Sequence, residues 1–178
     1  DMLERFRAHE YDILLGTQMV TKGHDFPAVD VSGVILADTA LYLEDFRASE
    51  RAFSMMTQLV GRAGRAGQQG RAVIQTCNPD HPVIDYASRQ DYDAFYKSEI
   101  AYRRAMLFPP FCHIALISVT GEDERLVMET STGLYTLLTD LIGGEYRDVA
   151  LICFGPFEAA VYRVNRTFRY RIVCKIKQ

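Results

Sequence analysis

No stretch of this sequence is apolar for long enough to cross a lipid bilayer, and its first residues lack the charged-then-apolar pattern of a signal peptide. Low-complexity tracts are absent too, and glycine and proline occur in ordinary numbers. These absences argue against a membrane protein and against a disordered one. We therefore expect a folded, soluble, cytoplasmic protein without a membrane partner. Its 178 residues leave room for one large domain or two small ones.

Cysteine is scarce and scattered. The four cysteines form no C-x-x-C pair and lie at Cys77, Cys112, Cys153 and Cys174. That spacing provides neither the framework of a disulfide-rich secreted domain nor a zinc site. We predict reduced, mostly buried thiols and no metal ligands in this chain.

Acidic residues are missing from the C-terminal end, although the protein as a whole carries a formal net charge of −3. Residues 159–178 hold six basic side chains and no acidic one. The net charge does not indicate a nucleic-acid-binding protein, but the distribution predicts a local cationic surface at this end.

The first half of the chain has the pattern of an α/β domain. Apolar residues at helical spacing predict a helix over 48–60. Apolar runs predict strands at 13–15, 29–37 and 72–76, the first of them buried on both faces. Strands that alternate with helical segments indicate a parallel sheet, and such sheets bind ligands at the carboxyl ends of their strands. Residues 17–25 and 38–45 occupy those positions.

The second half predicts a smaller α+β unit. A helix over 92–106 must end before Pro109 and Pro110, and its inner side is predicted to consist of Tyr92, Phe95, Tyr96, Tyr102 and Met106. The remaining predicted elements are a strand at 114–120, a helix at 123–142, and strands at 149–154, 159–163 and 168–177, with a turn at Gly155-Pro156.

This β-α-β-β order resembles the first four elements of a split βαβ fold. We predict a first domain at 1–82, a helical linker at 83–110 and a C-terminal α+β domain at 111–178. The final helix and strand of the split βαβ fold are missing, so we expect a truncated second domain. The chain begins at Asp1 rather than at a methionine, and we expect it to be a piece of a longer protein.

Residues 58–65 have the sequence Q-x-x-G-R-x-G-R, in which a helix runs into glycines and two arginines, Arg62 and Arg65. Guanidinium groups are permanent, planar donors suited to phosphate oxygens, and glycine permits a close approach. At a seam between domains this is the chemistry of an arginine finger, which neutralises charge on a transferred phosphoryl group. The alternative is an ordinary helix end, where glycine caps the helix and arginine favours its dipole.

A second polar stretch, 16–27, follows the first predicted strand. Thr17 and Thr21 offer hydroxyls, and the turn amides can form an anion-binding nest. Asp25 could accept a hydrogen bond from a ribose hydroxyl, but it could equally be a turn former. The role of His24 stays open between a catalytic and a structural histidine.

These stretches together carry a resemblance. A strand followed by G-T-x-x-x-x-x-G-x-D, a second strand, a helix and Q-x-x-G-R-x-G-R resembles motifs V and VI in the second RecA-like lobe of superfamily 2 helicases. A narrower resemblance, to the primosomal protein N′ (PriA) family of bacterial replication-restart DNA helicases, rests on residues 16–27, D-F-R-A-S-E-R at 45–51, residues 58–67, Pro109-Pro110, and Gly155-Pro156 with the basic-aromatic hairpin after it. It covers essentially the whole chain.

The resemblance implies a fold and a set of functional residues. Residues 1–82 would be the second half of a RecA-like helicase lobe 2, in an ATP-dependent 3′-to-5′ helicase that starts primosome assembly at stalled forks. Arg62 and Arg65 match arginines that reach the ATP phosphates, and Gln58 matches a glutamine near the γ-phosphate or the attacking water. Gly23 and Asp25 match positions beside the nucleotide.

The sequence departs from a complete helicase in two respects, because it has neither a G-x-x-x-x-G-K-[ST] phosphate cradle nor an acidic magnesium motif. ATP and Mg²⁺ are therefore implied to be bound mainly by the missing lobe. Zinc belongs to an upstream region of the family, with no ligands here. We predict that this chain alone neither hydrolyses ATP nor unwinds DNA. The alternative function is a non-enzymatic module that binds DNA structures or partner proteins.

The C-terminal hairpin has three interpretations. In the first, its arginines grip branched or single-stranded DNA and its aromatic rings stack on bases. In the second, it binds an acidic peptide, such as the tail of single-stranded DNA-binding protein, beside other primosome proteins. In the third, it is a charged strand face above aromatic core residues, as the alternation of strand 168–177 indicates. The predicted DNA-binding residues are Thr17, Arg163, Arg166, Arg169 and Arg171.

Overall fold

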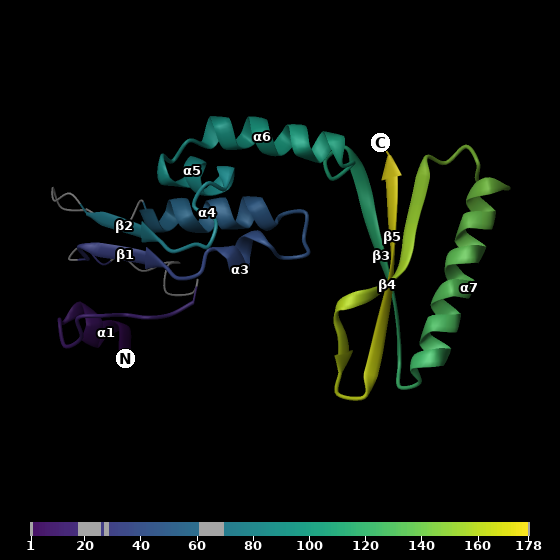
Figure 1. The fold of residues 1–178 in the computed structure, drawn as a ribbon, viewed down its shortest axis with the longest axis horizontal. Helices are drawn as coiled ribbons and strands as arrows, with labels where there is room; N and C mark the ends of the chain where they lie inside the picture. The colour runs from purple at the N-terminus through teal and green to yellow at the C-terminus, as the bar shows by residue number, and fades with distance from the viewer. Residues whose placement is uncertain (1, 18–25, 27–28, 61–69, 178) are drawn as a thin grey trace. The chain divides into compact units, whose positions relative to one another are not determined.

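A computed structural model describes residues 2–17, 26, 29–60 and 70–177 (Figure 1). The chain divides into two compact units, Asp1–Glu99 and Ile100–Gln178. In chain order the elements are α1 (Met2–Arg7), β1 (Val31–Val34), α3 (Asp38–Leu41), α4 (Ala48–Val60), β2 (Arg71–Ile74), α5 (Pro82–Ser88), α6 (Tyr92–Ala105), β3 (Cys112–Gly121), α7 (Glu124–Gly143), β4 (Leu151–Val164) and β5 (Thr167–Lys177). Among the described residues, no helix is long and apolar enough to span a membrane.

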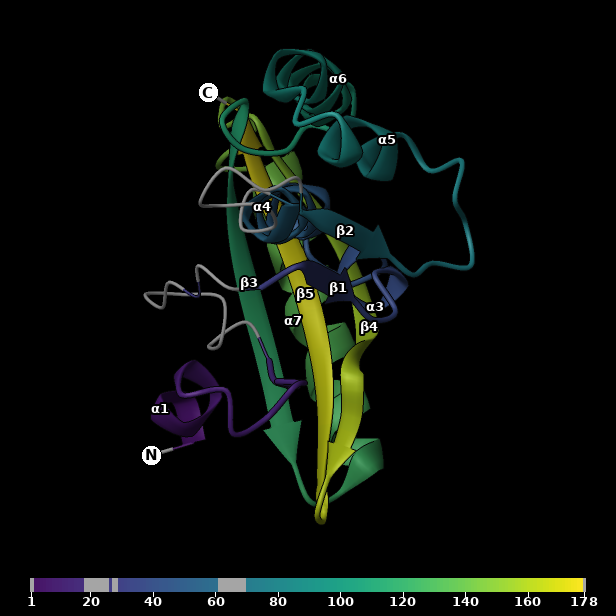
Figure 2. The same ribbon diagram turned by 90° about the vertical axis from the view of Figure 1, so that its left-hand side faces the viewer.

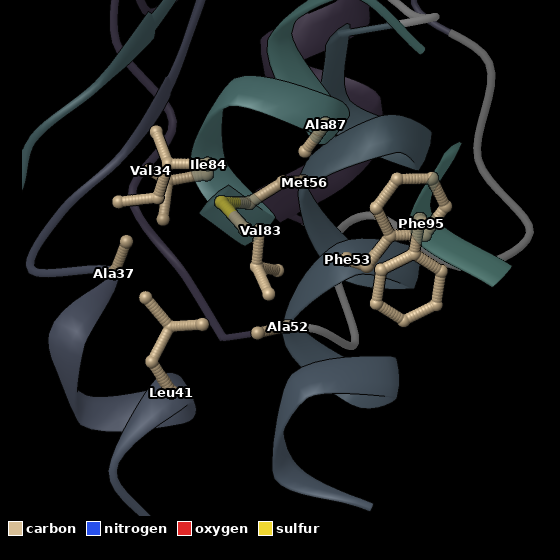
Figure 3. Packing of buried hydrophobic residues seen from close by; sticks show 10 residues of the cluster. All are labelled: Val34, Ala37, Leu41, Ala52, Phe53, Met56, Val83, Ile84, Ala87 and Phe95. Atoms are coloured by element: carbon tan, nitrogen blue, oxygen red, sulfur yellow. The ribbon is translucent and has the colours of Figure 1, made fainter. Parts of the chain in front are cut away.

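The first unit is built on the predicted parallel pairing. Strands β1 and β2 run parallel, with Val31 opposite Arg71 and Val34 opposite Ile74. Helix α4 has the predicted bounds, 48–60, because its apolar residues recur at helical spacing and turn one stripe inward. Figure 3 shows the resulting core, whose buried members are Val34, Ala37, Leu41, Ala52, Phe53, Met56, Val83, Ile84, Ala87 and Phe95.

Helices α5 and α6 contribute to this core, although residues 83–110 were predicted as a linker. Helix α5 begins where the His81 side chain accepts a hydrogen bond from the Val83 amide (3.2 Å) and Pro82 presets the first turn. In α6, the Phe95 ring stacks on Phe53 with centroids 4.1 Å apart (Figure 3). The predicted boundaries at residues 82 and 110 stay predictions, but this packing ties the start of the segment to the first unit.

Two predictions for the first half and for α6 are wrong. Residues 13–15 form no strand; Ile13 and Leu15 are 84% and 76% exposed, because no described strand lies beside them to supply hydrogen-bond partners. In α6, only Phe95 of the predicted inner side is buried, and it is the one residue of α6 in the buried core cluster of the described first unit. The other four are about half exposed or more: Tyr92, Tyr96, Tyr102 and Met106.

The second unit has the predicted split βαβ arrangement. Its sheet has the order β3-β5-β4, and β5 is antiparallel to both neighbours. Strands β3 and β4 are therefore parallel to each other, with β5 inserted between them. Helix α7 connects β3 to β4 and begins at Asp123, whose carboxylate accepts a hydrogen bond from the Leu126 amide (3.1 Å). Figure 1 shows α7 lying along one side of this sheet.

Strand β4 is continuous, whereas the sequence predicted two strands separated by a turn at Gly155-Pro156. The register on β5 shifts between Phe154 and Phe157, so the chain bulges there without leaving the sheet. Gly155 has a φ of +125°, and a Cβ atom on it would lie 2.9 Å from the Arg171 carbonyl oxygen. Glycine and proline therefore mark a bulge here, not the end of a strand.

The predicted alternation of β5 is confirmed. Tyr170, Ile172 and Cys174 are buried on the side of α7, and Val127 and Ser131 are the buried residues of that helix. The intervening basic residues of β5 point to the opposite face.

Truncation of the most central core side chain tests this description of the first unit. Met56 is fully buried, so Met56→Ala removes apolar contacts and leaves a cavity. We expect a loss of about 2–5 kcal/mol in the free energy of unfolding, measured by urea denaturation. Met2 is 64% exposed in the same unit, and Met2→Ala should change it by less than about 0.5 kcal/mol. Equal effects of the two substitutions would contradict the proposed core.

The four cysteines provide a second test, because all are free thiols in different surroundings. Cys77 is exposed, and Cys112 and Cys174 are buried. Burial and a contact with Cys153 (Sγ–Sγ 3.0 Å) raise the pKa of the Cys174 thiol to about 12, so its reactive thiolate is depleted at every pH below that value.

We expect iodoacetamide at pH 8 to alkylate Cys77 of the folded protein first and Cys174 last, as followed by mass spectrometry of peptides. All four should react at similar rates in urea, which is the control for intrinsic reactivity. Equal rates in the folded protein would show that Cys174 does not lie beneath α7.

Candidate nucleotide edge and nucleic-acid surface

The carboxyl ends of β1 and β2 meet in a polar cluster around Asp38. Its carboxylate accepts hydrogen bonds from the Thr76 hydroxyl (3.1 Å) and the Cys77 amide (3.0 Å), which link the segments after the two strands. The Cys77 amide is the main cause that lowers the pKa of Asp38. This is the edge at which parallel sheets bind ligands, and the sequence had placed residues 38–45 there.

A second carboxylate organises the start of α4. Asp45 accepts hydrogen bonds from the Arg47 amide (2.9 Å) and pairs with the guanidinium groups of Arg47 (3.3 Å) and Arg51 (2.9 Å). The Arg47 amide is the main cause that lowers the pKa of Asp45. Within the run D-F-R-A-S-E-R at 45–51, these contacts form an ion-paired start of α4.

Among the predicted nucleotide residues, the structure describes only Gln58. It lies in the last turn of α4 on the exposed side, and its amide nitrogen donates a hydrogen bond to the Ser54 hydroxyl (3.1 Å). The other predicted residues, Gly23, Asp25, Arg62 and Arg65, lie outside the described residues, as does His24. Their roles stay predictions. Thr17, predicted to bind DNA, is exposed.

The aromatic rings of the C-terminal hairpin pack against one another. The Tyr162 ring lies 5.6 Å from Phe168 and 5.8 Å from the buried Tyr170, both in edge-on geometry. The Tyr162 hydroxyl bonds to the Glu124 carboxylate at the start of α7, and this contact raises the pKa of Tyr162. These rings are thus held on the α7 side, which favours the third interpretation, aromatic core residues, over base stacking.

The four arginines of the hairpin do not form one patch. Arg163 lies over the Phe168 ring (4.9 Å) and donates a hydrogen bond to the Asn165 carbonyl (3.2 Å). Arg166 is exposed at the turn between β4 and β5. Arg169 and Arg171 point to the other side of the sheet, because they alternate with Tyr170. The predicted DNA-binding set is thus divided between two faces.

Two aromatic residues that were not predicted from the sequence lie on the same face as Arg171. Phe157 lies directly opposite Arg171, and Phe154 lies opposite Val173. Their side chains are 54% and 41% exposed. The sequence signal for them was the presence of a phenylalanine on each side of Gly155-Pro156. Because Gly155-Pro156 was predicted to be a turn, the two phenylalanines were not predicted to lie on one face of a strand.

Comparisons with known proteins match each of the two compact units to a different protein domain. The family model of the helicase conserved C-terminal domain matches residues 1–67, and that of the primosomal protein N C-terminal domain matches residues 104–178. Replication restart protein PriA of Bacillus subtilis is 38% identical over 177 residues, 99% of this chain and 21% of the relative. The chain is thus similar to PriA replication restart proteins over nearly its whole length.

Further PriA relatives show the same extent of similarity. The protein of Treponema pallidum is 37% identical over 173 residues, which are 97% of this chain and 26% of the relative. That of Synechocystis is 34% identical over 174 residues, 98% of this chain and 20% of the relative. The chain thus spans between 20% and 26% of the length of these PriA proteins.

The match to the helicase C-terminal domain and the two observed sheets confirm the predicted fold class. The helicase C-terminal domain is a RecA-like lobe 2, and its match includes β1, α4 and every predicted nucleotide residue. The PriA C-terminal match includes the antiparallel sheet and all four hairpin arginines.

Proposed function

We propose that this chain acts as part of helicase lobe 2 and as the C-terminal domain of an ATP-dependent 3′-to-5′ DNA helicase, which recognises stalled or branched replication forks and starts primosome assembly. One observation carries the proposal: a helicase domain and a primosomal C-terminal domain follow each other in a chain that resembles replication restart proteins over nearly its whole length.

The nucleotide would lie between this lobe and another. Arg62 and Arg65 would bind its phosphates and compensate charge that develops on the γ-phosphoryl group, while Gln58 would orient the attacking water. The exposed side chain of Gln58 at the end of α4 supports this arrangement. ATP and Mg²⁺ would be held mainly by the other lobe, which would supply the phosphate cradle and the acidic magnesium motif that this sequence lacks. Zinc would likewise be bound outside this chain.

DNA is the main partner that we propose, bound as a branched or single strand by Thr17 and the hairpin arginines, Arg163, Arg166, Arg169 and Arg171. The exposed Arg166 and the uncovered face of Arg169 and Arg171 support this assignment. Acidic segments of single-stranded DNA-binding protein and of other primosome proteins would compete for the same cations. We place the protein in the bacterial cytoplasm, associated with the nucleoid.

Loss of the motif arginine tests the enzymatic part. In the full-length protein, Arg65→Ala should lower the DNA-stimulated rate of ATP hydrolysis by about a thousandfold or more, the usual contribution of an arginine finger. Arg89→Ala is the matched control, because Arg89 is an exposed residue that pairs with Asp85 on α5, and it should leave the rate unchanged. The 178-residue chain alone should hydrolyse no ATP; hydrolysis by it would contradict the proposal.

Salt dependence tests the DNA contacts. Replacing Arg169 and Arg171 by glutamine removes two phosphate-binding cations, so the slope of log affinity against log salt for forked DNA should shrink by about 2. The control is Arg125→Gln on α7, where Arg125 is 85% exposed and paired with Glu129 (2.7 Å). An unchanged slope in the double variant would contradict binding through this face.

The alternative, a non-enzymatic module for DNA structures or partner proteins, is favoured by one observation: the cationic surface lies wholly in the second unit. It predicts that the full-length protein hydrolyses no ATP and that Arg65→Ala leaves DNA binding unaffected.

A further inference from the structure

Among the described residues of the second unit, α7 lies on one face of the sheet and no helix lies on the other, which we call the open face. Its two central rows cross all three strands, and in each row the residues lie directly opposite one another. The rows are Leu116, Val173 and Phe154, and Ser118, Arg171 and Phe157. Helix α7 covers the other face, where Ile172 and Cys174 are buried. Figure 2 shows α7 behind these strands.

The bulge of β4 places both phenylalanines on the open face. In a regular strand, side chains three positions apart point to opposite faces. Here three residue steps on β4, from Phe154 to Phe157, match two steps on β5, from Val173 to Arg171. The extra residue turns Phe157 to the side of Phe154, although burial beneath α7 would remove its apolar ring from water. Bulges of this kind re-aim side chains beside functional sites.

The rings on the open face are accessible, unlike those on the α7 face. Phe157 is 54% exposed, Phe154 41% and Leu116 53%. On the other face, the rings of Tyr162, Phe168 and Tyr170 pack against one another. Apolar area of this kind is unfavourable in water unless a ligand covers it.

Two arginines share this face with the exposed rings. Arg171 is directly opposite Phe157 in the strand register, and Arg169 lies two residues before Arg171 on β5, on the same face. In the described part of the chain neither arginine forms an ion pair, and no acidic residue occupies the two rows. Lys175 differs, since its Nζ atom donates to the Met106 carbonyl (2.9 Å) and lies 4.0 Å from the Phe108 ring centroid. The same atom lies 5.7 Å from the centroid of the Phe154 ring, so it adds a cation beside that ring.

We propose that the open face binds single-stranded nucleic acid, with unpaired bases stacked on Phe154 and Phe157 and the backbone phosphates on Arg169 and Arg171. Aromatic rings next to cations on a surface suit this ligand, because every base has a π-face and a phosphate follows each base. A duplex would not fit, since its bases are stacked on one another. The inference rests on the proposed function for DNA as the ligand, and it adds recognition of the bases.

The test compares two fluorescein-labelled single strands of equal length, about 12 thymidines and an abasic strand with the same phosphates, by fluorescence anisotropy with the 178-residue chain. We expect tighter binding of the thymidine strand. Phe154→Ala plus Phe157→Ala should weaken that binding about fivefold or more and leave the abasic strand unaffected. Phe157→Tyr, which keeps the ring, should preserve it.

Tyr146→Ala is the matched control, because Tyr146 is 48% exposed between α7 and β4, away from the open face. Thermal unfolding followed by circular dichroism checks that each variant folds. Equal affinity for the two strands overturns the inference but leaves DNA binding by the arginines intact, whereas binding of neither strand also overturns that part of the proposed function. Tighter binding of an acidic peptide that depends on Phe157 likewise overturns it.

Discussion

The second unit depends on the pairing of β5 with a strand on each side. Hydrogen bonds to β3 and β4 hold its backbone, so successive side chains must point alternately towards α7 and away from it. Burial of Tyr170, Ile172 and Cys174 decides which set points inward. A slip of one residue would place Arg169 and Arg171 beneath α7 without partners, at a large cost in free energy. The register of β5 therefore determines both the packing of the core beneath α7 and the face on which Arg169 and Arg171 lie.

Periodic segments were predictable because their pattern is local. Helix α4 has the predicted bounds, since its stripe of apolar residues specifies both the helix and its inner face. The alternation of β5 and the β-α-β-β order predicted the second fold in the same way. Features that depend on distant partners were not predictable. The apolar run at 13–15 has the composition of a buried strand, but composition does not provide a neighbouring strand.

The candidate sites show the same difference between features set by local sequence and features set by distant contacts. The nucleotide residues were predicted through a resemblance. The described geometry around Asp38 and Asp45 agrees with a ligand-binding sheet edge and an ion-paired helix start. For the hairpin, the sequence left the aromatic rings between stacking and core, and their mutual contacts favour the core. Phe154 and Phe157 escaped notice because the face of a residue beyond a bulge cannot be counted from its position.

This bulge separates what stabilises the second unit from what we propose binds nucleic acid. Arg171 reaches the open face because Ile172, its neighbour, is buried beneath α7, so its position follows from the core. Phe157 reaches that face only through an extra residue in β4, which a single glycine accommodates. Any side chain at Gly155 would meet both an unfavourable φ and the Arg171 carbonyl oxygen. A change there would therefore press on the β5 backbone at Arg171 and Ile172 as well as on the bulge that positions Phe157.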